Sequence, residues 1–93
     1  VQQLSGAGAV DLDNLITELT TTGANALTLA DGTTSGQVKI ITMIVDGGDG
    51  TLTPTTFANG STVTFDAVAE SVTLVWNSAI GWVATSVQGA TIA

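Results

Sequence analysis

The chain has 93 residues, which is enough for one small domain but not for a two-lobed enzyme with a cleft between its lobes. Only 10% of the residues are charged, as one Lys and eight carboxylates, and the formal net charge is −7. The absence of His and Cys excludes an imidazole base, a thiolate, a disulfide framework and an ordinary zinc or copper site. One cationic side chain cannot neutralise several phosphates, so nucleic acid is a poor partner. We therefore expect a neutral β-rich assembly module with no cofactor, and not an enzyme.

The first residues predict an arm. Residues 1–9 read VQQLSGAGA, a small and uncharged sequence with little to hold it in a core. We expect a division into an N-terminal arm, residues 1–9, and a single β domain, residues 10–93. The arm lacks the basic region and long apolar core of a secretory signal. Residues 40–45 form the longest strongly apolar stretch and are too short for a membrane span of about 20 residues, so we expect no membrane partner.

Residues 11–22 are ambiguous from the sequence alone. Leu12, Leu15, Ile16 and Leu19 recur at helical spacing, which favours an amphipathic helix. Four threonines in the same segment favour a strand, because β-branched side chains are stiff at χ1. Both readings stay open at this point.

The next segment predicts a strand that is covered on both faces. Val38, Ile40 and Ile44 alternate with Ile41, Met43 and Val45, so both faces of the strand are apolar. In so short a chain the second cover is expected to come from another subunit, because a neutral threonine-rich surface with few charged edges tends to pair with its neighbours. The predicted oligomer interface therefore comprises Val38, Ile40, Ile41, Met43, Ile44 and Val45.

Two hairpins are predicted farther along the chain. Asn59-Gly60 is the pair preferred in two-residue type I′ turns, and pairing outward from it sets Leu52 opposite Ala67 and Pro54 opposite Phe65 on one apolar face. A second hairpin through residues 77–81 places Trp76 across from Trp82. Together with turn signals every 8–12 residues, these features predict an all-β fold: a small antiparallel sandwich or barrel-like domain of six to eight short strands.

Most candidate chemical sites have an ordinary structural explanation. Residues 46–50, DGGDG, supply two carboxylates. Their spacing matches neither the EF-hand loop nor the calcium-binding nonapeptide, so a turn is favoured. Asp66 and Glu70 lack the apolar pocket that a glycosidase pair requires, and no activated nucleophile is evident, so we predict no catalytic residue and no metal site.

Three further features also have ordinary structural explanations. Trp76 and Trp82 are a possible tip or ligand contact, although packing is the more common role of facing tryptophans. Lys39 stands alone in an apolar strand and is expected to snorkel or to pair with a carboxylate of its own chain or of another subunit. Asn59-Gly60-Ser61 matches a glycosylation sequon, but the turn already explains it.

A chain of short motifs resembles a known family. ALTLADG is followed by GQVKII, then DGGDGTLTP, an Asn-Gly hairpin with TFD, SVTLVW and a closing GWV. In order and spacing, residues 17–86 resemble small structural proteins of tailed bacteriophages, of the type common among viruses of marine bacteria and cyanobacteria. The resemblance favours a strand in residues 17–22.

The resemblance also implies a function. Such proteins are virion components that decorate the capsid as cement or head-fibre proteins, or form modules of tail fibres, and many are homotrimers. It implies assembly in the host cytoplasm, with copies of itself and the major capsid protein or other virion proteins as partners. We expect Val1, Gln2, Gln3 and Leu4 to anchor the arm on the capsid. The alternative is a tail-fibre or carbohydrate-binding module that contacts the host surface.

Overall fold

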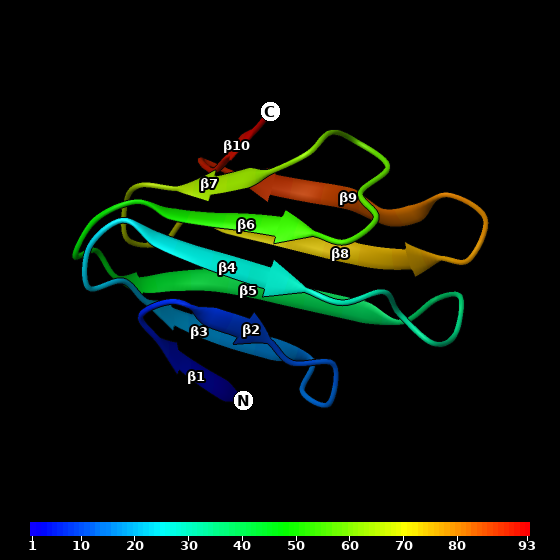
Figure 1. Ribbon diagram of the computed structural model, residues 1–93, viewed down its shortest axis with the longest axis horizontal. Coiled ribbons are helices and arrows are strands. Elements are labelled where there is room, and N and C mark those ends of the chain that lie inside the picture. Colours follow the sequence, from blue (N-terminus) through cyan, green and yellow to red (C-terminus); the bar gives the residue numbers. More distant parts are fainter.

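The computed structural model describes all of residues 1–93 and contains ten β-strands arranged in two layers (Figure 1). The strands, in chain order, are β1 (Gln2–Ser5), β2 (Gly8–Val10), β3 (Ile16–Thr20), β4 (Asn25–Leu29), β5 (Val38–Val45), β6 (Gly50–Pro54), β7 (Val63–Phe65), β8 (Ser71–Asn77), β9 (Gly81–Gln88) and β10 (Thr91–Ile92).

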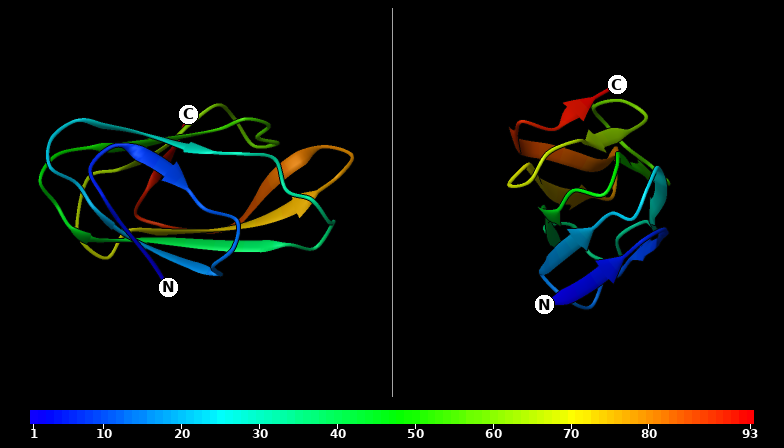
Figure 2. Two further views of the ribbon diagram at one scale, coloured as in Figure 1. Left: turned by 60° about the horizontal axis from the view of Figure 1, so that its bottom comes forward. Right: turned by 90° about the vertical axis from the view of Figure 1, so that its left-hand side faces the viewer.

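The two layers are five-stranded sheets that pack face to face as a sandwich (Figure 2). Sheet A has the order β1-β3-β5-β8-β9, and sheet B has the order β10-β7-β6-β4-β2. The predicted all-β class and sandwich are confirmed. Three finer expectations are wrong: the sheets are mixed and not antiparallel throughout, the sandwich is not a closed barrel, and the strands number ten instead of six to eight.

The first six strands alternate between the two sheets. β1, β3 and β5 pair in parallel within sheet A, and β2, β4 and β6 pair in parallel within sheet B. Each consecutive pair of strands therefore makes one turn of a flattened coil, and three such turns stack on one another. Paired residues in these ladders are separated by one full turn of the coil, as in Asn25 opposite Gly50. No short turn in the sequence therefore indicates which strands pair.

The last four strands are antiparallel to their neighbours. The β8–β9 hairpin is confirmed in its register, with Trp76 opposite Trp82 and Asn77 opposite Gly81. The β6–β7 pair keeps the predicted apolar face, but its register differs by four residues, because Leu52 lies opposite Val63 and not Ala67. Asn59-Gly60 does not form a two-residue turn but lies within a longer loop between β6 and β7.

Residues 55–62 form a longer loop because they bind the edge of β9. Ala58 N–H donates to the carbonyl oxygen of Trp82 (2.9 Å), and Trp82 N–H donates to that of Thr56 (2.9 Å). The side-chain oxygen of Asn59 accepts a hydrogen bond from Ala84 N–H (2.7 Å). These bonds outweigh the local preference for a two-residue turn.

The core lies between the sheets and includes side chains from eight strands. In β3, Thr17 and Leu19 point inward on alternate positions, which confirms the strand reading of this segment. The buried apolar residues form one continuous cluster of Val10, Leu19, Leu27, Leu29, Ile41, Met43, Leu52, Val63, Phe65, Val72, Leu74, Trp76 and Trp82.

The N-terminal segment is part of both sheets. β1 pairs with β3, β2 pairs with β4, and Leu4 packs against the core cluster. The expected separation of residues 1–9 from a domain of residues 10–93 is therefore wrong. The composition predicts an arm, but backbone hydrogen bonds hold residues with small side chains in a sheet as well as residues with large ones.

Candidate binding surfaces

The two tryptophans lie inside the sandwich. Trp82 is 0% exposed and Trp76 8%, and their ring centroids are 5.4 Å apart in an edge-to-face arrangement. The indole N–H of Trp82 donates to the carbonyl oxygen of Ala30 (2.9 Å), so its polar group also has a partner inside the chain. Neither ring offers an open face for a sugar, which corrects the suggestion of a tip or ligand contact.

The predicted interface residues divide between the inside and the outside. Ile41 and Met43 are fully buried in the chain's own core and cannot contact another subunit. Ile44 and Val45 are exposed at the end of β5. Val38 and Ile40 point outward from the middle of sheet A and are half-buried by their neighbours.

An apolar surface surrounds Val38 and Ile40. Ile40 lies opposite Ile16 on β3, and Val38 lies opposite Val75 on β8, which in turn lies opposite Val83 on β9. We call this set the sheet A patch, and it comprises Ile16, Val38, Ile40, Val75 and Val83. It spans four adjacent strands and contains no charged side chain.

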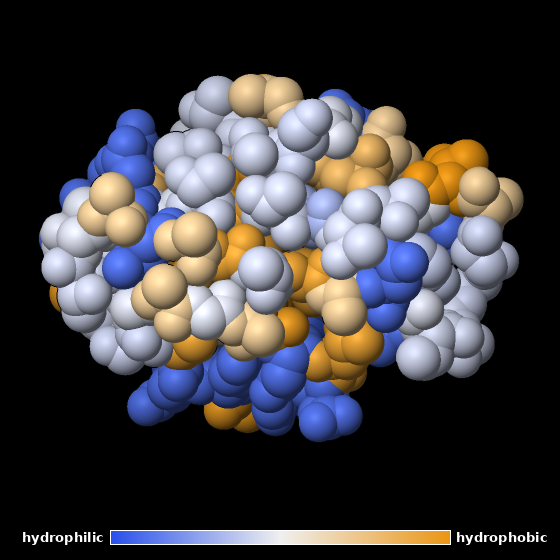
Figure 3. Space-filling view, in the orientation of Figure 1, coloured by the Kyte–Doolittle hydropathy of each residue, from blue (hydrophilic) through white to orange (hydrophobic).

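The outer face of sheet B is different in chemistry. Seven strand positions point outward in two rows, and every one is Thr or Ala: Ala26, Thr51, Thr64 and Thr91 in one row, and Ala9, Thr28 and Thr53 in the other. Figure 3 shows this face as largely neutral in hydropathy, with hydrophilic residues gathered along its lower margin.

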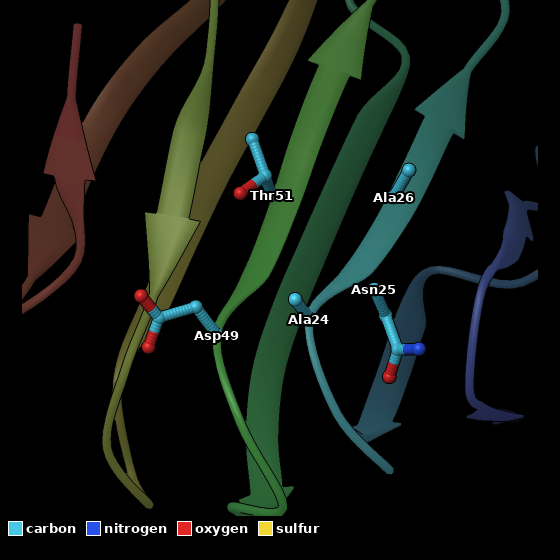
Figure 4. Close-up of a pocket in the computed structure, with 5 residues that line it drawn as sticks. All are labelled: Ala24, Asn25, Ala26, Asp49 and Thr51. Atoms are coloured by element: carbon cyan, nitrogen blue, oxygen red, sulfur yellow. The ribbon is translucent and has the colours of Figure 1, made fainter.

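A shallow hollow marks one end of the sheet B face. It lies where β4 and β6 begin, and Figure 4 shows its lining residues Ala24, Asn25, Ala26, Asp49 and Thr51. Asp49 supplies the only carboxylate of the lining, so the hollow has one charged group and little depth for holding a ligand.

The glycine-rich loop of residues 46–49 has a structural role. The carboxylate of Asp46 accepts a hydrogen bond from Gly48 N–H (3.1 Å), as in an ordinary Asx turn. Thr21 Oγ1 accepts from Gly47 N–H (2.9 Å) and donates to the carbonyl oxygen of Gly48 (2.7 Å). Gly47 and Gly48 pass so close to the backbone of residues 21–23 that a Cβ on either would collide with it. The loop is thus bound to its neighbour through its backbone, in agreement with the turn interpretation.

The remaining acidic pair closes another turn. A carboxylate oxygen of Glu70 accepts a hydrogen bond from Asp66 N–H (2.7 Å). Nowhere in the chain do three or more His, Cys, Asp or Glu side chains gather as they would around a metal ion.

A buried polar network around Lys39 was not anticipated from the sequence. Lys39 is 0% exposed, and its Nζ donates to the carbonyl oxygen of Asn14 (2.7 Å), to Thr17 Oγ1 (2.8 Å) and to a carboxylate oxygen of Asp11 (3.4 Å). Gln2 Oε1 extends the network by accepting from Thr17 Oγ1 (2.8 Å) and from Asp11 N–H (2.9 Å). Lys39 therefore does not snorkel, and its carboxylate partner belongs to its own chain.

The network shifts two pKa values. Burial lowers the pKa of Lys39, and the neighbouring charges of Asp11 and Asp13 offset this only in part. Burial alone would raise the pKa of Asp11, but hydrogen bonds from Asn14 and the charge of Lys39 outweigh it, so the pKa of Asp11 is lowered from 3.8. The signal that the sequence offered was a single Lys within an apolar strand. Its partners lie in a loop and on other strands, which spacing does not reveal.

The predicted anchoring residues lie at an open end of the sandwich. β1 is an edge strand of sheet A and β2 is an edge strand of sheet B. No other segment pairs with the outer edge of either strand. We call the edges of these two strands the open end. Val1 is 70% exposed, whereas Gln2 is bound in the network and Gln3 donates a hydrogen bond to Glu18 (3.3 Å).

Comparison of the chain with protein-family models and with curated proteins found no match. The structure contains no helix that is long and apolar enough to cross a membrane.

Proposed function

We propose that this chain is a virion structural protein that decorates and stabilises a bacteriophage capsid as a cement or head-fibre protein. The observation that carries the proposal is the sheet A patch, a flat aliphatic surface built on four adjacent strands of a rigid sandwich. A surface of this kind binds another protein by removing apolar area from water, at about 25 cal/mol per Å² buried. The family resemblance supplies the kind of partner.

The proposed mechanism is mechanical. The chain docks on an assembled shell, buries apolar area across a junction between shell subunits and opposes their separation. Copies of the chain associate as a homotrimer, as the resemblance implies, with Val38 and Ile40 in the contact. The acidic net charge keeps particles that carry many copies from aggregating.

A tail-fibre or carbohydrate-binding module is the second candidate. The observation that favours it is the hollow beside Asp49, which opens on the uncharged face of sheet B. Because both tryptophans are buried, such a module would bind a glycan without aromatic stacking.

Immunogold electron microscopy of virions that carry the protein separates the two candidates. The proposal predicts gold at regular density over the head. Label confined to the tail would favour the second candidate, and unlabelled, well-preserved particles would contradict both.

A pair of matched variants tests the sheet A patch. Val75→Lys places a charge at the centre of the patch, whereas Thr53→Lys places the same charge on the outer face of sheet B. Both positions point outward, so each variant is expected to change the free energy of unfolding by only about 0.5–1 kcal/mol. We expect Val75→Lys alone to lose co-sedimentation with capsids and to reduce the mass measured by light scattering to that of a single chain. Equal behaviour of the two variants would contradict the role of the patch.

A further inference from the structure

We propose that the open end is a strand-addition site, and that its occupant is an extended segment of the shell protein with apolar side chains at alternate positions and basic residues at its flanks. The inference rests on the proposed function and specifies how the anchor works: the backbone of β1 and β2, more than any side chain, holds the partner.

The first argument comes from the backbone of β1. Gly6 N–H donates to the carbonyl oxygen of Thr20 on β3 (2.9 Å). Since backbone groups point to opposite sides at successive residues of a strand, the N–H and C=O groups of Gln3 and Ser5 point away from β3, toward the open side. An added strand satisfies these groups, whereas a globular surface does not.

The second argument is that the edge is already held in place. Gln2 Nε2 donates to the carbonyl oxygen of Ala9 (3.0 Å), which ties β1 to β2, and Gln2 Oε1 is fixed by Thr17 and Asp11. Binding therefore requires little further ordering of β1, and a preordered edge gains affinity for that reason.

The third argument concerns the apolar side chains at this end. Leu4 lies opposite Leu19 and packs against the core cluster, but it is only half-buried because no strand follows β1. An added strand with an inward apolar side chain beside Leu4 would extend the core by one position. The alternation of a strand then places polar side chains on its outer face.

The fourth argument is charge, and it decides against a second copy as the occupant. Asp13 is exposed in the loop between β2 and β3, and Glu18 lies on β3 next to Gln3, so carboxylates flank the open end. Figure 3 shows hydrophilic residues gathered along the margin where Figure 1 places β1 and β3. The only basic side chain, Lys39, is fully buried. A second copy would therefore bring carboxylates to carboxylates, whereas a segment with basic flanks complements them.

The test uses the full chain and a synthetic peptide of alternating Thr and Val flanked by lysines. Amide chemical shifts of the isotope-labelled protein are followed during titration. We expect the largest changes in β1 and β2, and an affinity about tenfold lower for the same peptide with glutamate flanks. A peptide N-methylated at every residue, which removes its backbone donors along both edges, should not bind. Shifts confined to the outer faces of the sheets, or undiminished binding of the N-methylated peptide, would overturn the inference.

A pair of variants tests whether the edge of β1 is needed for binding to capsids. Ser5→Pro removes an outward N–H at the edge without disturbing the β1–β3 ladder, and Ser5→Ala removes the same hydroxyl but keeps the N–H. We expect Ser5→Pro to lose co-sedimentation with capsids and Ser5→Ala to retain it, with wild-type unfolding midpoints confirming that both fold. If Ser5→Pro binds capsids as the wild type does, the strand-addition site is wrong while decoration stands. If the wild-type chain itself fails to bind capsids, the proposed function is wrong.

Discussion

At the end of the sandwich where β9 and β10 lie, the loop of residues 55–62 covers the edge of β9, and β10 is only two residues long. At the opposite end, β1 and β2 present their edges with no covering loop. Natural sheets protect their edges with short strands, bulges, charged side chains or covering loops. Short edge strands occur at both ends, but a loop covers an edge at one end only, so the edges of β1 and β2 stay free to pair.

The difference between the ends also follows the topology. The closed end is made by antiparallel strands whose connections fold back over the edge, as the loop after β6 does. The open end is the first turn of a parallel coil, and a further turn of the same kind would fit against it. One end is thus built to terminate the sheets, and the other has the geometry to continue them.

The largest expected effect comes from breaking the closed end. Trp82→Ala removes a fully buried ring that packs on Trp76 and donates to Ala30, and we expect it to cost about 3–5 kcal/mol of unfolding free energy. Trp82→Phe keeps most of the volume and should cost less. Urea unfolding of the two variants measures both values. A cost for the Ala variant below that of the Phe variant would contradict the packing that we describe.

A pair of leucines measures how the packing weakens toward the open end. Leu29→Ala on β4, one strand in from the open end, should cost about 2–5 kcal/mol, because Leu29 is fully buried. Leu4→Ala at the open end should cost about 1 kcal/mol, since that side chain is only partly buried. Equal costs in urea unfolding would mean that Leu4 is packed as tightly as the buried core around Leu29.

The network behind the open end gives a third test. Lys39→Met fills a similar volume but leaves Thr17 and the carbonyl oxygen of Asn14 without their buried donor, so we expect a loss of about 1–3 kcal/mol. Hydrogen exchange should show the loss first as faster exchange in β1, because Gln2 is held by Thr17. Uniform acceleration across both sheets would show instead that the network does not specifically support the open end.

The smallest effect is a pH dependence. The pKa of Asp11 is lowered in the folded chain, so the unfolded chain binds that proton more readily. The Asp11 carboxylate therefore stabilises the folded chain fully above pH 3.8, its ordinary pKa, and this contribution is lost as the pH falls below that value. Asp11→Asn should make the unfolding free energy depend less steeply on pH in that range, as measured by urea unfolding on both sides of it. An unchanged slope would contradict the lowered pKa of Asp11.

The sequence predicted the fold best where strand partners are neighbours in the chain. The Trp76–Trp82 register follows from a short turn and from matching residues on either side of it. The parallel ladders of β1 to β6 join residues one coil turn apart, and neither composition nor periodicity indicates such partners. The β6–β7 register was missed because the intervening loop binds β9, a contact that only the tertiary structure reveals.

The surfaces were predictable only in part. The periodicity of β5 indicated two apolar faces but did not reveal which of them is the chain's own core. The small side chains of residues 1–9 predict a free arm, yet backbone pairing holds these residues in the two sheets.

Electron cryomicroscopy of capsids that carry the protein tests the central claim most directly. Our account predicts density for the sandwich on the head surface, with one additional strand from the shell protein continuing sheet A beyond β1. A sandwich that contacts the shell only through other surfaces, with the edges of β1 and β2 facing solvent, would contradict it.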